Sequence, residues 1–175
     1  MKTIWMLTGC ALLATAPTPG AAQARGAGSI DSVMTELYAS VTRVPGKPFP
    51  WDRLRAVMWP GAIMLPQASQ SPGASAPVGV EAFIARVDSF TTPALSAPND
   101  QGFYERQTNL VVDQWGDIAQ AFTTYEKGPY EPRRIMSRGI NTVQLIRRSG
   151  RWYILSITWD EENTAGPLPP KYRGK

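Results

Sequence analysis

The chain contains no histidine and only one cysteine, Cys10, among its 175 residues. The missing histidine excludes Ser-His-Asp and Cys-His catalysis as they are usually built, and it excludes zinc sites made of Cys and His. Proton transfer in this protein therefore has to use Asp, Glu, Tyr, Lys or water. We accordingly expect neither a metal site nor a cofactor.

Charge is sparse and mixed in sign. Lys and Arg number 18 and Asp and Glu 14, which gives a net charge of +4. A nucleic-acid footprint would need a longer basic face with interleaved aromatic residues, so no nucleic-acid partner is predicted. The hydrophobic fraction of 43% and the chain length fit one globular domain with a real core.

The first 24 residues have the pattern of a secretory signal peptide. Lys2 supplies a positive charge, residues 4–16 are mostly apolar, and residues 22–24 form an Ala-x-Ala cleavage site. The apolar run is shorter than the about 20 residues of a stable membrane span. We therefore expect export to the periplasm or the exterior. Lipid attachment at Cys10 is the less favoured alternative, because Cys10 lies too close to Lys2 and the apolar run continues beyond it.

The rest of the chain changes from helical to strand periodicity. Apolar residues at helical spacing predict helices over 29–43, 51–58 and 80–90, and a short apolar strand is expected at 62–66. Val, Ile, Thr and aromatic residues then predict four long strands over 102–115, 117–126, 135–147 and 151–160. This order gives an α+β class, in which helices cover one face of a curved antiparallel sheet. Residues 166–175 form a Pro-rich tail with a basic end, which we expect to be loose.

Several of these segments together resemble one superfamily. They are WDRLRAVMWPGAIML at 51–65, VEAFIARVDSF at 80–90, and the strand segments GFYER, IAQAFTTYE, RGINTVQL and RWYILSITWDEE. Residues 30–165 resemble the nuclear transport factor 2-like superfamily, also called SnoaL-like, and in particular an exported bacterial subgroup of unknown function. The resemblance implies a cone-shaped domain over residues 25–165, with three helices on a strongly curved sheet and a central cavity.

The same resemblance leaves the function open. Members include ketosteroid isomerases, dehydratases, polyketide cyclases and pure binding or assembly domains, so the fold does not fix an activity. Several of these enzymes use an Asp-His pair, which a chain without histidine cannot provide. Many relatives form homodimers through the sheet, which implies a homodimer here.

Polar residues on the concave face of such a sheet are the candidates for ligand contacts, because side chains alternate between the two faces. The sequence does not fix the phase of that alternation. Tyr125, Arg138, Asn141 and Trp159 are predicted to bind a ligand. The alternative for Arg138 is a cross-strand ion pair with Glu126 that only stabilises the hairpin.

Two residues are weak candidates for catalysis. Glu105 lies beside Arg106, one of the two should point inward, and a buried carboxylate there would have a raised pKa. Tyr125 is the second candidate. The acidic cluster at 160–162 is interpreted as a solvated strand end, because neighbouring carboxylates in a strand point to opposite faces.

Three hypotheses remain. The leading one is an exported pocket domain that binds a small, mostly apolar or aromatic molecule. The alternative is a cofactor-free enzyme of isomerase, hydratase or cyclase type that uses Tyr and a carboxylate. The third is a homodimeric structural or interaction domain. The enzyme hypothesis requires a carboxylate inside the cavity.

Overall fold

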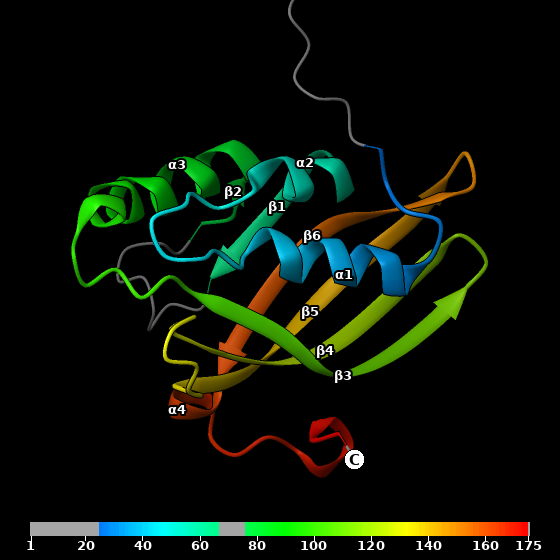
Figure 1. Ribbon diagram of the computed structural model, residues 1–175. Coiled ribbons are helices and arrows are strands. Elements are labelled where there is room, and N and C mark those ends of the chain that lie inside the picture. Colours follow the sequence, from blue (N-terminus) through cyan, green and yellow to red (C-terminus); the bar gives the residue numbers. More distant parts are fainter. Residues whose placement is uncertain (1–24, 67–75, 175) are drawn as a thin grey trace, which may run out of the picture.

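A computed structural model describes residues 25–66 and 76–174 and shows helices packed on one curved, unclosed sheet (Figure 1). The helices are α1 (Ile30–Ser40), α2 (Trp51–Val57), α3 (Val80–Thr91) and α4 (Glu162–Ala165), with short 3₁₀ turns η2 (Thr92–Ser96) and η3 (Pro170–Tyr172). The strands are β1 (Met58–Pro66), β2 (Val78–Gly79), β3 (Tyr104–Trp115), β4 (Ile118–Gly128), β5 (Ser137–Arg148) and β6 (Arg151–Glu161). The predicted α+β class is confirmed. The predicted signal peptide lies outside the described residues.

The six strands follow the order β2-β1-β6-β5-β4-β3. All neighbouring pairs are antiparallel except β1 and β6, which run parallel. Two-residue turns join β3 to β4 and β5 to β6. The second turn has positive φ at Ser149 (50°) and Gly150 (73°), a backbone that suits the right-handed twist of a hairpin.

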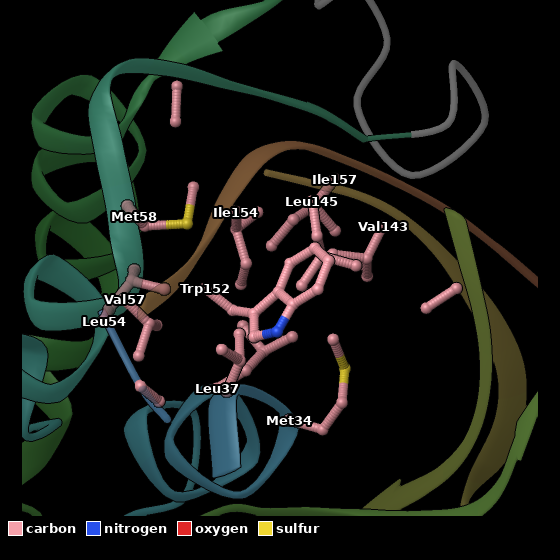
Figure 2. Packing of buried hydrophobic residues seen from close by; sticks show 14 of the residues in the cluster. Met34, Leu37, Leu54, Val57, Met58, Val143, Leu145, Trp152, Ile154 and Ile157 are labelled. Atoms are coloured by element: carbon pink, nitrogen blue, oxygen red, sulfur yellow. The ribbon is translucent and has the colours of Figure 1, made fainter. Parts of the chain in front are cut away.

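The helices α1 and α2 cover part of the concave face of the sheet. The Ser29 hydroxyl caps α1 by accepting a hydrogen bond from the Ser32 amide at 3.1 Å. The i, i+3, i+4 stripe of α1 then buries Val33, Met34 and Leu37. Figure 2 shows the indole of Trp152 between Met34 and Leu37 of α1 and the inward residues of β5 and β6. This core fixes the face of each strand that points inward.

The boundary between α2 and β1 differs from the expected one. A helix was expected over 51–58 and a strand over 62–66, but α2 ends at Val57 and β1 begins at Met58, so Pro60 and Gly61 belong to the strand. Met58 pairs with Ile154 and Ile63 with Ser156, so that residues 59–62 bulge out of the ladder. Proline lacks the amide proton that regular pairing requires, which is why the ladder is interrupted there.

The Pro-rich tail is not loose. Leu168 is buried, and the Tyr172 ring stacks on Phe122 of β4 with centroids 5.1 Å apart. The Thr124 hydroxyl donates a hydrogen bond to the Tyr172 carbonyl at 2.6 Å. Phe122 and Thr124 alternate with the core-facing residues of β4, so the tail covers part of the outer face of the sheet.

Candidate functional site: an aromatic-walled cavity with a polar end

A cavity of about 400 Å³ lies between the concave face of the sheet, α1 and α3. Its apolar wall is largely aromatic, and it includes Phe49, Trp51, Phe83, Phe103 and Trp159. These rings touch in series. Phe49 stacks on Trp51 at 4.8 Å, and Phe83 meets Trp51 and Trp159 edge to face, each at 6.2 Å between centroids. Such a wall favours a flat, apolar ligand.

The polar end of the cavity is made by inward positions of three neighbouring strands. Glu105 of β3 lies opposite Lys127 of β4, and Tyr125, two residues before Lys127, therefore shares its face. Asn141 comes from β5 and also faces the cavity. Together these four side chains form the polar end of the cavity.

Tyr125 fits at this position because of the glycine opposite it. Tyr125 pairs with Gly139, and a Cβ built on Gly139 would lie 2.5 Å from the Tyr125 hydroxyl. Any larger residue at position 139 would displace the phenol. The Tyr125 hydroxyl donates a hydrogen bond to Oε1 of Glu161 at 3.3 Å. Tyr125 thus lines the cavity, but its hydroxyl proton is donated to Glu161 and is not available to a ligand.

Glu161 is buried and has several donors. Besides Tyr125, the Ser137 hydroxyl donates to its Oε2 at 2.6 Å, and Lys127 forms an ion pair with its Oε1. Glu161 is only 3% exposed, so the expectation of a solvated strand end is wrong for this residue. These partners make Glu161 a structural anion that positions Tyr125 and Lys127.

Glu105 is the second carboxylate at this end and has a different environment. Loss of contact with water raises the pKa of Glu105 to about 7, and the nearby charge of Glu161 adds to the rise. The charge of Lys127 and a hydrogen bond from Asn141 act in the opposite direction but do not cancel the rise. Glu105 can therefore gain or release a proton near neutral pH.

Asn141 is held in place by a chain of hydrogen bonds. Its Nδ2 donates to the Tyr38 hydroxyl of α1 at 3.1 Å, and the Tyr38 hydroxyl is 2.8 Å from the hydroxyl of Thr123. Thr123 in turn donates to Oε1 of Gln107 at 3.2 Å. Since the single hydroxyl proton of Thr123 goes to Gln107, the Tyr38 hydroxyl donates to Thr123. Burial raises the pKa of Tyr38, so its phenol stays protonated and can act as a donor in this series of hydrogen bonds.

A buried ion pair lies elsewhere on the cavity wall. Arg43 follows α1, and its guanidinium donates to both oxygens of Asp100 at 2.7 Å. The amides of Gly46 and Gly102 donate to the same carboxylate at 2.8 and 3.1 Å. This pair joins the segment after α1 to the segment before β3, and it keeps Phe49 and Phe103 beside the cavity.

Four of the five residues singled out from the sequence come together here: Glu105, Tyr125, Asn141 and Trp159 all line the cavity. Arg138 does not. It is exposed and alternates with Gly139 and Asn141, so it projects from the opposite face of β5. Its predicted place in the pocket is therefore wrong.

The predicted cross-strand ion pair between Glu126 and Arg138 does not form, because Glu126 pairs with Arg106 instead. The two residues are in register, but Glu126 accepts its hydrogen bond from Nε of Arg106 on the other side, at 2.6 Å. Of the neighbours Glu105 and Arg106, Glu105 is thus the one that points inward.

Four residues that line the cavity or bind its lining residues were not singled out from the sequence: Tyr38, Arg43, Lys127 and Glu161. Lys127 could have been found, because it is two residues beyond Tyr125 on the same strand. Tyr38 lies in the apolar stripe of α1, so the sequence pattern marks it only as a core residue. Within residues 25–66 and 76–174, no group of three or more His, Cys, Asp or Glu side chains has the arrangement of a metal site. No helix in that same part of the chain is long and apolar enough to span a membrane.

No protein-family model and no curated protein sequence matches this chain. Solved structures do resemble it. A cystatin-like protein of unknown function from Nostoc punctiforme aligns with a TM-score of 0.57 at 11% identity, over 82% of this chain and 91% of that one. A hexachlorocyclohexane dehydrochlorinase from Novosphingobium barchaimii aligns with a TM-score of 0.55 at 15% identity, over 81% and 92%. A nuclear transport factor 2-like protein of unknown function from Pseudomonas putida aligns with a TM-score of 0.52 at 17% identity, over 81% and 91%.

These likenesses show the fold. The chain has the nuclear transport factor 2-like, or cystatin-like, fold, as the segments quoted above predicted. Proteins with this fold include an enzyme and proteins of unknown function, so the activity has to be argued from the cavity itself.

Proposed function

We propose that this protein is an exported pocket domain that binds a small, mostly apolar molecule carrying one hydrogen-bonding group. The observation that carries the proposal is the distribution of polarity in the cavity: an aromatic wall, one end with several polar side chains, and Arg43 elsewhere on the wall, neutralised by Asp100. Its volume of about 400 Å³ lies within the range of ligand pockets. Export rests on the sequence pattern of residues 1–24 alone.

The polar end also indicates how such a ligand would be held. Glu161 already has its donors, and the Tyr125 proton is committed to Glu161. Glu105 and Asn141 therefore remain to contact the ligand. A protonated Glu105 donates to a carbonyl or ether oxygen, and an ionised Glu105 accepts from a hydroxyl.

A cavity-filling variant tests the binding proposal. Val87 of α3 lines the cavity, whereas Ser89 of the same helix is exposed. Val87→Trp should abolish binding of a fluorescent apolar probe, and Ser89→Trp should leave it unchanged. Native mass spectrometry of the purified protein should in addition detect a co-purifying small molecule. Equal probe binding by both variants contradicts the proposal.

The second candidate is a cofactor-free proton transfer, and the raised pKa of Glu105 favours it. An ionised Glu105 would take a proton from the carbon next to a ligand carbonyl and return it to another carbon, which is an isomerisation. Tyr125 is not the donor in this scheme, because its proton is committed to Glu161. Deuterium exchange into small cyclic ketones, followed by NMR, should increase through about pH 7 and stop in Glu105→Gln. Exchange that persists in this variant excludes Glu105 as the base.

We also propose self-association through the outer face of the sheet. Ile140 and Ile146 of β5 lie on this face and are only partly buried, whereas Phe122 of β4 lies under the tail. Size-exclusion chromatography with light scattering tests this point, and a monomer at tens-of-micromolar concentration refutes it. Tyr172→Ala, which loosens the tail, should strengthen the association if the tail limits access to this face.

A further inference from the structure

Two hairpin turns lie side by side at one end of the sheet, seen on the right in Figure 1. The first joins β3 to β4 between Trp115 and Ile118, and the second joins β5 to β6 between Arg148 and Arg151. The amide of Arg147 donates to the Asp117 carbonyl at 2.8 Å, and its Nε donates to the Asp117 carboxylate at 2.7 Å. The two turns therefore form one continuous surface.

The first turn exposes large apolar side chains. Trp115 is 83% exposed, the largest fraction among the exposed large hydrophobic residues of the described chain, and Ile118 opposite it is 55% exposed. Trp115 lies outside the buried core cluster and the partly buried residues packed against it. Trp115 therefore adds little to the packing of the described core, and together with Ile118 it presents an apolar surface that a partner can cover.

The second turn places arginines where they repel one another. Arg148 lies directly opposite Arg151, and like charges in that position destabilise a hairpin. Arg148 donates to the Arg147 carbonyl, and Arg151 donates to the carbonyls of Arg25 and Gly26. No carboxylate among the described residues forms an ion pair with Arg148 or Arg151. This end thus carries uncompensated positive charge beside an exposed indole.

The N-terminal segment joins the fold at the same end. The amide of Gly26 donates to the Ala56 carbonyl at 2.7 Å, and Ala27 pairs with Trp152, next to Arg151. Arg25 is therefore a further arginine at this surface, and residues 1–24 connect to the domain here. Cleavage at the predicted site would leave the new N-terminus at this same end.

From this juxtaposition we propose that the two-hairpin end, formed by Trp115, Ile118, Arg148, Arg151 and Arg25, docks on an anionic lipid surface. The arginines meet the lipid phosphates, and the indole of Trp115 enters the boundary between headgroups and acyl chains. Tryptophan suits that depth because one edge of its ring is apolar and the other carries an N–H. The competing occupant is a second copy of the chain, which the test below distinguishes by light scattering.

The proposal also orients the molecule. Lys127 at the polar end of the cavity and Ile118 at the tip are nine residues apart on β4, which in an extended strand is about 30 Å. Docking at the two-hairpin end therefore leaves the polar end of the cavity directed away from the lipid.

Vesicle co-sedimentation of the full chain tests the proposal. The vesicles contain either phosphatidylcholine alone or equal parts of phosphatidylglycerol and phosphatidylcholine. Arg148→Gln should weaken binding to the anionic vesicles about fivefold, and Trp115→Ser should weaken it about tenfold. The matched control is the double variant Met136→Ser, Arg138→Gln, which removes an exposed apolar and an exposed basic side chain near the start of β5. The control should bind like the parent protein.

Three outcomes overturn the proposal. Equal binding by the parent and the tip variants would place the contact in residues 1–24, which all of them share. Equal loss in the tip and control variants would indicate unspecific charge attraction. A tip variant that changes the oligomeric state in light scattering while vesicle binding is unchanged would assign the surface to a second copy of the chain. Support requires preference for the anionic vesicles, loss at high salt and loss in the tip variants only.

Discussion

Two carboxylates beside the same cavity show opposite behaviour. Asp100, next to the segment after α1, receives four hydrogen bonds, from both terminal nitrogens of Arg43 and from two backbone amides. These donors, chiefly the Arg43 guanidinium, hold the pKa of Asp100 well below its usual value. Glu105, at the polar end, has no such set of donors, and loss of contact with water raises its pKa to about 7.

This difference separates the carboxylates that stabilise the fold from those that can still bind a ligand or transfer a proton. A carboxylate saturated with donors is a structural anion, and Glu161 belongs to the same kind. A carboxylate with few partners destabilises the fold when ionised, but it can bind a ligand or transfer a proton. The following variants test this contrast.

Asp100→Asn should have the largest effect, since it leaves the buried Arg43 guanidinium without a counter-charge. The free energy of unfolding should fall by about 3 to 5 kcal/mol near neutral pH. Urea unfolding measures this loss. Asp117→Asn is the control, because the Arg147–Asp117 pair is about half exposed and should contribute under about 1 kcal/mol.

The loss of stability in Asp100→Asn should depend on pH. The folded-state pKa of Asp100 lies below its unfolded value, so its stabilisation is present above that value and is lost as the pH falls through the folded pKa. The difference in unfolding free energy between the parent and Asp100→Asn should therefore be smaller at acid pH than at neutral pH. A deficit that is the same at acid and neutral pH would mean that Asp100 acts through shape and not through charge.

Glu105→Gln should have the next largest effect on the free energy of unfolding, and it should increase this free energy where Asp100→Asn decreases it. The folded pKa of about 7 lies above the unfolded value near 4.5, so the folded chain binds the additional proton between these values. The contribution of Glu105 to stability is present below about pH 4.5 and falls as the pH rises to about 7. The variant should avoid this loss and be more stable than the parent above pH 7 by about 2 to 3 kcal/mol.

Urea unfolding of parent and variant at acid and at mildly basic pH measures this difference directly. Glu126→Gln is a useful comparison, because Glu126 also carries a carboxylate but lies on the outer face, paired with Arg106. It should show no stabilisation at basic pH. A Glu105→Gln variant that is no more stable than the parent above pH 7 would contradict the contrast with Asp100.

Asn141→Leu should have the smallest effect on stability. It removes the hydrogen bond to Tyr38 and should lower the free energy of unfolding by about 1 kcal/mol. It also removes a hydrogen bond that lowers the pKa of Glu105, so that pKa should rise further above 7. NMR titration of the Glu105 carboxyl carbon measures the shift. A lower pKa would show that Asn141 stabilises the protonated acid instead.

Much of the fold could be predicted because the pattern is local. Strand boundaries expected from β-branched and aromatic residues agree with β3 to β6 within about two residues, since each strand has one buried and one solvated face. The alternation along β5 also separated Arg138 from Asn141 correctly. It left open which set is buried, and both residues were predicted to bind a ligand although only one of the two faces lines the cavity.

The candidate site was less predictable, because its residues come from distant parts of the chain. Tyr38 and Asn141 are separated by 103 residues and meet only when α1 crosses the sheet. In β6 the register shifts beside Ser156, so Trp152 and Ile154 face inward before the bulge and Ile157, Trp159 and Glu161 after it. A strict alternation along that strand cannot place Trp159 and Glu161 on the buried face.

The sequence by itself determined the class of the fold, the positions of its strands and the absence of histidine chemistry, because composition and periodicity act locally. Only the tertiary structure decided which carboxylate is saturated and which is not. That difference depends on how many donors distant segments bring to each oxygen: four reach Asp100, and loss of water outweighs the few that reach Glu105. Burial without sufficient donors is a property of packing, which no stretch of sequence expresses alone.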